Sequence, residues 1–517
     1  MIYLRKGKHA KGYAILLQYD FPGCAEPRVV FSGFFVCFAL VFHIHSKSEG
    51  RVYRDMERFF KLKELGTNVR TEIMAGLTTF MTMAYILAVN PSILGGEGLL
   101  DPYAVFLATA LAAGIFTIAM GLFVNFPVAL APGMGLNAFF ATTVIASKAT
   151  DHPITPSMGL AAVFISGIIF LILTITQIRQ ILIVAIPDAL KHAITVGIGL
   201  FITIIGLKNS GLMTIAVDGV TADGQYKELL GFQSIIHMGN LENSTVYMTI
   251  AGLAIISILM VLKIRGAILY GILLVTLLGF IPGIDIVSFD SLKGQDWVPQ
   301  LDKLNFWDFD FADLLTTGLL TAVATFTFVE LFDTFGTLVG TANRAGFFKD
   351  KEKGKKIVGK AMFVDAVAVS GGAMLGTSTV TAYVESSAGV AAGGRSGLTA
   401  VSTGVCFIIA LFLAPVALLI PPSATSAALI IVGVLMLQSV KEIDFSDYVV
   451  GIPAFLTVAL MPFTYNIANG ISFGVVSYVL LAFIANLAGD KKHRIHWLMW
   501  VLFFVVIARY AFVGSQG

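Results

Sequence analysis

The sequence predicts an all-α polytopic membrane protein of 14 transmembrane segments, built as a 7+7 inverted repeat with short broken or extended stretches in segments 3 and 10. Three observations predict this class. Of the 517 residues, 57% are hydrophobic and 13% are charged, whereas soluble proteins carry about 25% charged residues. Apolar runs of bilayer-spanning length recur along the chain. The two runs that are most interrupted by small and polar residues lie at corresponding places in the two halves.

The apolar runs define the predicted segments, each about 17 to 25 residues long as a bilayer requires. In order they are 72–93, 102–124, 131–147, 157–177, 187–206, 245–262, 266–283, 314–340, 357–374, 378–393, 397–419, 424–440, 447–464 and 467–488. A further stretch at 495–512 contains Arg509 and several aromatic residues, so we expect it to lie in the membrane interface.

The first 55 residues differ from the rest of the chain. They begin with basic residues, and their apolar run at 29–41 is too short for a membrane span. We expect residues 1–55 to be a non-native or disordered leader. Met56 opens a basic, amphipathic approach to segment 1.

Basic residues predict the orientation. If segment 1 starts in the cytoplasm, the loops after even-numbered segments should be rich in Lys and Arg. The loop after segment 8, NRAGFFKDKEKGKKIVGK, carries seven. The other loops on the same side contribute Arg179, Lys263, Arg265, Arg395, Lys441, Lys491, Lys492 and Arg494. The pattern predicts a multi-pass protein of the cell membrane with both termini in the cytoplasm.

Segments 3 and 10 are short and irregular. Segment 3 begins ALAPGMGLNAFFA (129–141), and segment 10 reads GTSTVTAYVESSAGVAAGGRSG (376–397). Irregular backbone at membrane depth is tolerated only where it is buried in protein or lines a cavity. The two segments are seven apart, as are the Thr- and Phe-rich segments 1 and 8. This arrangement is typical of inverted-repeat transporters, whose binding site lies between the broken helices near the bilayer midplane.

Segment 8 carries two acids in the stretch TFVELFDTFGTL (327–338). At 3.6 residues per turn, Glu330 and Asp333 share one helix face with Thr334 and Thr337. One Asp at the centre of a membrane helix costs roughly 2.5 to 3.5 kcal/mol, so these acids should face protein or water. Glu385, in the break of segment 10, is the third candidate.

The chemistry of these residues predicts the ligand. Ionised carboxylates only accept hydrogen bonds, whereas Asn137 in segment 3 offers both a donor and an acceptor. Backbone N–H groups freed at the half-helix starts can donate to a ligand carbonyl. They follow Gly133, Gly135, Thr377 and Thr379. The set describes a pocket for a flat, neutral heterocycle, with ring faces for stacking from Phe139, Phe140, Phe328, Phe332 and Tyr383. The predicted substrate-binding residues are Glu330, Glu385, Asn137, Phe139, Tyr383, Thr79 and Thr379.

Buried, neighbouring acids also predict energy coupling, because one of them can bind and release a proton near neutral pH. The predicted proton-coupling residues are Asp333, Glu330 and Glu385. Sodium is the competing, less favoured ion. A structural alternative stays open for Asp333, which can cap internal polar groups, and Asp365 on segment 9 is either structural or part of a relay.

Several classes are disfavoured. The chain contains no phosphate-binding loop, no HExxH and no nucleophile elbow, so we expect neither an enzyme nor direct ATP-driven transport. Its three cysteines have neither paired nor metal-ligand spacing, and we expect no cofactor or metal. The formal net charge of +2 gives no sign of nucleic-acid binding.

Four motifs together carry a family resemblance: GLTTFMTMAYILAVNP, APGMGLNAFF, FVELFDTFGTL and GTSTVTAYVESSAGVAAGGRSG. In this order they resemble the AzgA-like purine permeases, a branch of the nucleobase–ascorbate transporter superfamily, from about Met56 to the C-terminus. The resemblance implies proton-coupled uptake of adenine, guanine or hypoxanthine. It also implies that Asn137, Glu330 and Glu385 contact the purine and that Asp333 tunes affinity or coupling. Many members carry Asp where this chain has Glu330, which leaves the preferred purine open.

The resemblance further implies a core domain of segments 1–4 and 8–11 and a gate domain of segments 5–7 and 12–14. The corresponding boundaries are 56–180 and 313–420 for the core, 181–312 and 421–490 for the gate, and 491–517 for a C-terminal interfacial segment. Expected partners are a purine nucleobase, the proton, the lipid bilayer and a second copy of the chain in a homodimer.

Other functions stay open at this point. An anion transporter or exchanger of the same architecture would need positive charge, or half-helix ends without neighbouring acids, near the bilayer midplane to bind its anion. A passive nucleobase channel is a further alternative, and a membrane receptor would need an output domain that does not follow segment 14.

Overall fold

The structure is a computed structural model, and it describes residues 49–148, 153–176, 185–215, 236–281, 284, 286–287, 297–311, 317–489 and 492–513. Most of the predicted leader, residues 1–48, lies outside the described residues. Glu49 to Phe59 form the helix α2, so the last part of the predicted leader is helical.

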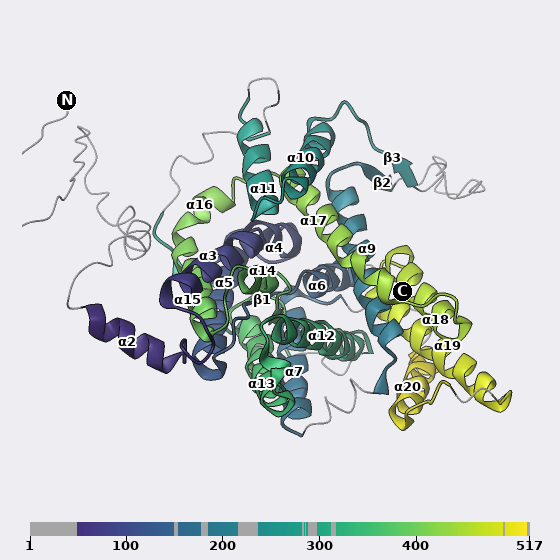
Figure 1. Ribbon diagram of the computed structural model, residues 1–517. Coiled ribbons are helices and arrows are strands. Elements are labelled where there is room, and N and C mark those ends of the chain that lie inside the picture. Colours follow the sequence, from purple (N-terminus) through teal and green to yellow (C-terminus); the bar gives the residue numbers. More distant parts are fainter. Residues whose placement is uncertain are drawn as a thin grey trace, which may run out of the picture. The chain divides into compact units, whose positions relative to one another are not determined.

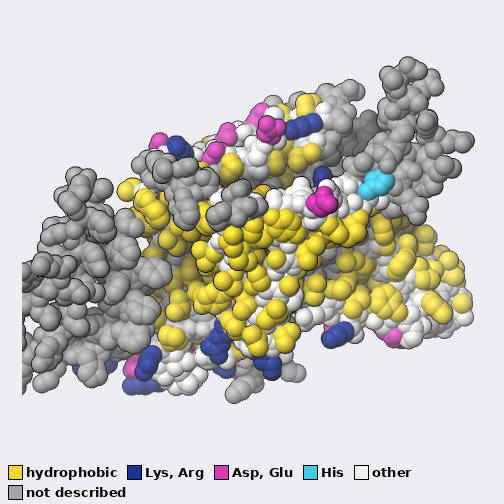
Figure 2. Space-filling view, turned by 90° about the horizontal axis from the view of Figure 1, so that it is seen from above, with side chains coloured by type: hydrophobic (Ala, Val, Ile, Leu, Met, Phe, Trp, Pro, Cys, Tyr) yellow, Lys and Arg dark blue, Asp and Glu magenta, His cyan; other side chains and the backbone are white. Residues whose placement is uncertain are grey.

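The described chain is mostly helical, which confirms the predicted all-α class, while the count of 14 segments and the 7+7 repeat stay predictions. Nine of its helices are long and apolar enough to span a membrane. Figure 2 shows a broad band of hydrophobic side chains, with most of the visible Lys and Arg along its lower edge and most of the visible Asp and Glu along its upper edge. This band is the surface that a bilayer covers. The orientation of the termini stays a prediction.

The elements fall into two groups by their packing partners (Figure 1). The first group contains α3 (Val69–Met83), α4 (Ile86–Leu94), α5 (Pro102–Ala119), η1 (Met120–Val124), β1 (Leu130–Pro132), α6 (Met134–Ser147), α7 (Pro156–Ile175), α12 (Thr317–Arg344), η5 (Phe347–Lys349), α13 (Lys351–Met374), β4 (Val380–Ala382), α14 (Ser386–Ala391), α15 (Gly397–Ala410), η6 (Leu411–Leu413) and α16 (Ala414–Ala417).

The second group contains α9 (Asp188–Asn209), α10 (Ser244–Val261), α11 (Ala267–Leu278), α17 (Pro422–Leu437), η7 (Gln438–Glu442), α18 (Tyr448–Phe463), α19 (Ile467–Leu487) and α20 (Trp497–Val513). In this group α9 packs against both α17 and α18. The short pair β2 (Met213–Ile215) and β3 (Ile236–Met238) follows α9, and η4 (Leu301–Lys303) precedes α12.

Capping residues explain where many spans begin. The side chains of Asn68, Asp101, Thr155, Asn243 and Asn466 each accept a hydrogen bond from a backbone N–H two or three residues further on. Each such cap contributes about 1 kcal/mol to helix stability. Pro102 and Pro156 then occupy the first helical turn, where a missing N–H costs nothing.

The prediction of a basic loop after segment 8 was partly wrong, because much of this stretch is helical. We expected residues 343–360 to form a loop, but α12 continues to Arg344 and α13 already begins at Lys351. Lys and Glu are strong helix formers, and Lys355 and Glu352 pair one turn apart with Nζ and Oε1 separated by 3.3 Å. Hydropathy marks where the apolar part of a helix ends. It therefore missed the polar turns by which α12 and α13 extend past their apolar parts.

Candidate functional site

Segments 3 and 10 meet through a short antiparallel strand pair, β1 and β4, which confirms that both are broken. Leu130 lies opposite Ala382 and Pro132 opposite Val380. The pairing continues at both ends, because the Gly133 amide donates to the Thr379 carbonyl at 2.9 Å and the Tyr383 amide donates to the Ala129 carbonyl at 3.0 Å. All six strand residues are buried, as non-helical backbone at this depth requires.

Each strand leads directly into a helix, so two helix N-termini lie beside the strand pair. After β1 the chain enters α6 at Met134, and after β4 it enters α14 at Ser386. In Figure 1 the labels β1, α14, α6 and α12 lie close together among the surrounding helices.

The amides of Gly133 and Thr377 directly precede two of the backbone N–H groups that we expected to be free, and both of these amides are in use. The amide of Gly133 is bonded to Thr379, and the amide of Thr377 donates to the Gly372 carbonyl at 3.0 Å. The strand pair and the end of α13 satisfy these two amides internally, which the sequence pattern does not reveal. Whether the N–H groups that follow these two residues donate to a ligand stays a prediction.

Asn137 lies in the first turn of α6 and is fully buried. Its Nδ2 donates to Asn90 Oδ1 at 2.6 Å. Its Oδ1 has no hydrogen-bond partner within the described part of the chain. A buried acceptor without a partner costs about 1 to 3 kcal/mol, so this oxygen is a place where a ligand donor would be stabilising.

Thr379, at the start of segment 10, provides a second buried oxygen of this kind. Its Oγ1 is fully buried and, among the described residues, without a partner. The same holds for Oγ of Ser378. A Cβ built on Gly133 would lie 3.8 Å from the Thr379 hydroxyl, and the Asn137 amide bonds to the Gly133 carbonyl at 2.8 Å. The Thr379 hydroxyl thus lies beside Gly133, which is one helical turn before Asn137.

Glu330 on α12 is only 1% exposed, so it does not face lipid. Its Oε1 accepts a hydrogen bond from Thr334 Oγ1 at 3.2 Å. The Thr334 hydroxyl in turn lies 2.8 Å from the hydroxyl of Thr381 on β4. Hydroxyl groups therefore connect this carboxylate to the strand pair. The side chain of Asp333 lies outside the described residues.

Glu385 stands at the N-cap position of α14 and is half-buried. Its Oε1 accepts a hydrogen bond of 2.6 Å from the hydroxyl of Tyr85, which lies between α3 and α4. This short distance is typical of a hydroxyl bonded to a carboxylate. The structure thus brings Glu330 and Glu385 to the same strand, one through Thr381 and the other shortly after the end of β4.

Three of the predicted ring and hydroxyl contacts, Tyr383, Phe139 and Thr79, are buried. The Tyr383 hydroxyl donates to the Pro132 carbonyl across the pair. Phe139 packs edge-to-face on Phe326, with ring centroids 5.0 Å apart. Thr79 donates to the Ala75 carbonyl of its own helix at 3.1 Å and lies against Gly389 of α14. Whether these three residues touch a substrate stays a prediction.

Comparison with known proteins decides the family. The model described as "Permease family" (Xan_ur_permease) matches residues 70–473. The chain belongs to this family. A putative permease of Methanocaldococcus jannaschii is 41% identical over 464 residues, covering 90% of this chain and all of the relative. The adenine permease AdeP of Escherichia coli is 41% identical over 82% of this chain and 90% of its own length. The guanine/hypoxanthine permease PbuG of Bacillus subtilis is 39% identical over 89% of this chain and 100% of its own length.

Solved structures share the fold of this permease at low sequence identity. The transmembrane domain of the cyanobacterial bicarbonate transporter BicA superposes with a TM-score of 0.55 at 16% identity, covering 80% of this chain and 97% of that one. The structure of SLC26A9 superposes with a TM-score of 0.55 at 13% identity, covering 90% of this chain and 73% of that one. These likenesses concern the fold alone.

Sequence reasoning missed Asn90, which connects three segments of the permease. Its Nδ2 donates to Thr109 Oγ1 at 2.8 Å and to Thr377 Oγ1 at 2.9 Å, while its Oδ1 accepts from Asn137. The available signal was an Asn directly before Pro91 within an apolar run. Tyr85 was missed as well, because a single Tyr in an apolar segment is common.

Glu72 is a buried carboxylate with a different role. It is fully buried on α3 and accepts hydrogen bonds from the backbone amides of Arg395 and Ser396 at 2.8 and 3.1 Å. The hydroxyls of Ser396 and Thr399 also donate to it, at 2.8 and 2.6 Å. A carboxylate with four donors is satisfied within the protein, so it holds the chain in place where α15 begins.

Proposed function

We propose that this permease imports purine nucleobases by proton symport, with the substrate held at mid-depth between segments 3, 8 and 10. The observation that supports the proposal is the pair of carboxylates beside β4, because Glu330 reaches Thr381 through Thr334 and Glu385 follows the strand. Thr379 directly precedes β4, and Asn137 lies in the helix that follows its partner strand β1. The relatives named as adenine and guanine/hypoxanthine permeases support the choice of substrate class.

The donors of a purine ring suit this set of acceptors. Purine edges present N–H groups next to carbonyl or ring-nitrogen acceptors, and a carboxylate accepts two neighbouring donors. Asn137 Oδ1 would accept one more N–H, and the Thr379 hydroxyl can either donate or accept. Because these groups are buried, a ligand that lacks a matching donor leaves one of them unpaired, and this discriminates strongly against it.

The same acids provide a route for coupling. A charged carboxylate is costly at membrane depth, and proton binding removes that charge. We propose that Glu330, Glu385 or Asp333 binds the coupling proton, so that substrate and proton are carried together. Sodium stays the competing ion in this proposal.

The two groups of helices suggest how the substrate crosses. We propose that α3–α7 with α12–α16 form the core domain, and that α9–α11 with α17–α19 form the gate domain. Movement of one group against the other would expose the site alternately on the two sides of the membrane. In this proposal the permease lies in the cell membrane with both termini in the cytoplasm.

Anion exchange is the alternative that the shared fold with BicA and SLC26A9 raises. The two carboxylates disfavour it, because an anion placed beside them is repelled. A passive nucleobase channel is the second alternative.

Uptake into proteoliposomes tests the proposal. With an inward proton gradient, labelled hypoxanthine, guanine or adenine should accumulate above its external concentration, and a protonophore should abolish that accumulation. Replacing sodium with choline should leave uptake unchanged. Equilibration without accumulation would identify a channel, and competition by sulfate or bicarbonate instead of unlabelled purine would identify an anion transporter.

A further inference from the structure

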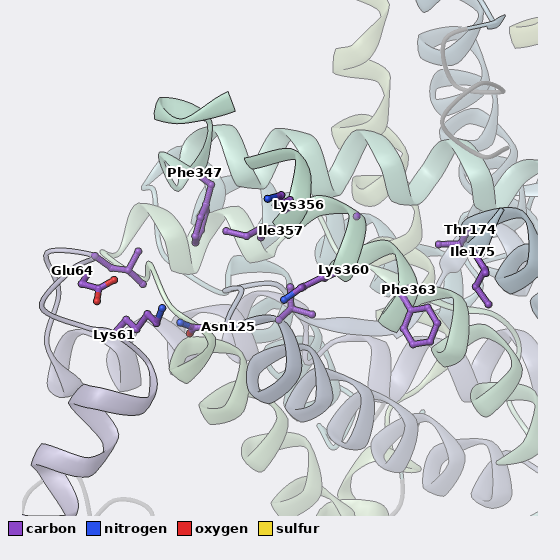
Figure 3. A pocket seen from close by; sticks show the side chains of 13 residues that line it. Lys61, Glu64, Asn125, Thr174, Ile175, Phe347, Lys356, Ile357, Lys360 and Phe363 are labelled. Carbon is purple, nitrogen blue, oxygen red and sulfur yellow. The ribbon is translucent and has the colours of Figure 1, made fainter. Parts of the chain in front are cut away.

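A groove of 680 Å³ lies where α7 and η1 end and α13 begins. None of the predicted site residues lines it. The lining residues are Lys61, Glu64, Leu65, Val124, Asn125, Thr174, Ile175, Phe347, Lys356, Ile357, Gly359, Lys360 and Phe363 (Figure 3). These positions border the loops that the basic residues predict to be cytoplasmic.

The groove carries excess positive charge. It contains three lysines, Lys61, Lys356 and Lys360, and one acid, Glu64. Within the described chain none of these lysines forms an ion pair, although their neighbours Lys63 and Lys355 pair with Glu57 and Glu352, each at 3.3 Å. Lys356 and Lys360 lie one turn apart on α13, where like charges repel each other. A bound anion would offset this repulsion.

The other end of the groove is apolar. In Figure 3, Phe363 and Ile175 lie at the end away from Lys61 and Glu64, with Lys356 and Lys360 in between. Phe363 is 46% exposed and Ile175 is 62% exposed. Both belong to helices that are long and apolar enough to span the membrane. The groove therefore leads from a basic end toward the hydrocarbon side of the helices.

We propose that this groove binds one anionic phospholipid. The phosphate would lie among Lys61, Lys356 and Lys360, and an acyl chain would run along Phe363 and Ile175. Lysine ammonium groups attract a phosphate as point charges, and basic pockets between membrane helices bind lipid head groups in this way. A free phosphate would use only the basic end, so the apolar end favours a lipid as the occupant.

The experiment uses the purified full chain in a neutral detergent. Native mass spectrometry counts bound lipid during titration with phosphatidylglycerol, with phosphatidylcholine of the same acyl chains, or with glycerol 3-phosphate. The thermal unfolding midpoint is measured in parallel. The test variant is Lys356→Gln with Lys360→Gln. The matched control is Lys63→Gln with Lys355→Gln, which removes the same charge from two lysines next to the groove that are paired with acids.

Phosphatidylglycerol should bind and raise the midpoint in the parent and in the control, while phosphatidylcholine should not. The test variant should bind phosphatidylglycerol roughly 5- to 30-fold more weakly. An equal loss of phosphatidylglycerol affinity in the test variant and the control, or no loss in the test variant, would overturn the proposed site. Equal stabilisation by glycerol 3-phosphate would identify a site for free anions instead. If the test variant is unstable, Lys61→Gln with Phe363→Ala addresses both ends of the groove from other positions.

Discussion

At the residue scale, the candidate site depends on buried or half-buried polar atoms that are held by other side chains. Glu330 is held through Thr334, Glu385 through Tyr85, and Asn137 through Asn90. Such second partners fix the orientation of the groups that would contact a ligand, and a fixed orientation lowers the entropy cost of binding.

Glu330→Gln tests the first of these groups directly. The neutral amide keeps the size of the side chain but loses one acceptor and the charge. Hydrogen bonds to a charged group contribute about 1.5 to 3 kcal/mol, so we expect roughly 10- to 150-fold weaker purine binding. Equilibrium binding of labelled purine to the purified variant measures this, and size-exclusion chromatography checks that it stays monodisperse.

Glu352→Gln is the control for that substitution. Glu352 lies on the exposed start of α13 and, among the described residues, pairs with Lys355. The same chemical change there should leave purine affinity unchanged. If Glu330→Gln binds as tightly as this control, Glu330 does not belong to the substrate site.

Asn90→Ala tests the role of a residue that we do not place in contact with substrate. Removing this amide leaves the Nδ2 of Asn137 and the hydroxyls of Thr109 and Thr377 without their shared partner. We expect about tenfold weaker purine binding together with a loss of about 1 to 3 kcal/mol of stability. Binding and thermal unfolding are measured on the same sample. Lost stability with unchanged affinity would make Asn90 purely structural.

The sequence indicated the acids and Asn137 but not the partners that hold them. An acid within an oily helix is conspicuous because it is costly there. In contrast, Tyr85 and Glu385 are 300 residues apart, and no periodic pattern relates them. Asn90 and Thr377, which are 287 residues apart, are connected only by the fold.

At the element scale, the strand pair requires a small residue directly after β1. A Cβ on Gly133 would lie 2.8 Å from Thr381 Cγ2. Thr381 is β-branched, and its hydroxyl is already bonded to Thr334, so it has little freedom to move away.

Gly133→Ala should therefore separate the two strands and displace the Thr381–Thr334–Glu330 connection. Overpacking of this kind costs about 1 to 3 kcal/mol, and we expect purine binding to fall with it. Thermal unfolding and binding are the measurements. Gly340→Ala on α12 is the control, because a Cβ there meets no atom within 4 Å and should be neutral or slightly stabilising.

Glu72→Ala tests whether this carboxylate holds α15 in place. The substitution leaves the amides of Arg395 and Ser396 and the hydroxyl of Thr399 without an acceptor. We expect the thermal stability to fall by several kcal/mol, since each buried unsatisfied group costs about 1 to 3 kcal/mol. Glu72→Gln, which keeps one oxygen acceptor, should lose less. An equal loss of thermal stability in both variants would show that the negative charge of Glu72, rather than its role as a hydrogen-bond acceptor, holds α15 in place.

Hydropathy located the helices of the described chain well, because a bilayer fixes their length and composition. The breaks in segments 3 and 10 were predictable for the same reason, since Gly and Pro are conspicuous there. The C-terminal end of α12 and the start of α13 could not be predicted from hydropathy. Outside the apolar stretch these helices are stabilised by residues of high helix propensity and by ion pairs.

At the scale of the whole molecule, the two groups of helices approach each other closely where α6 faces α9. A Cβ built on Gly135 of α6 would lie 2.4 Å from Cγ2 of Ile198 on α9. The proposed movement of core against gate would have to pass through this contact.

Gly135→Ala should therefore slow purine transport about tenfold or more by wedging α6 away from α9. Combining it with Ile198→Ala, which removes the obstructing methyl group, should restore transport to the level of Ile198→Ala alone. The double-mutant cycle in proteoliposomes gives the coupling between the two positions. Additive effects would show that the two residues do not act through their contact.

The strand pair also has a consequence for biosynthesis. Pro132 and Tyr383, which are bonded across it, are 251 residues apart in the chain. At about 5 to 20 residues per second, a ribosome needs roughly 12 to 50 s to deliver the second strand after the first. Throughout that interval the nascent first half carries an unpaired strand edge inside the lipid. The cell must shield this edge during insertion, and a truncated first half should be a target for membrane proteases rather than a stable product.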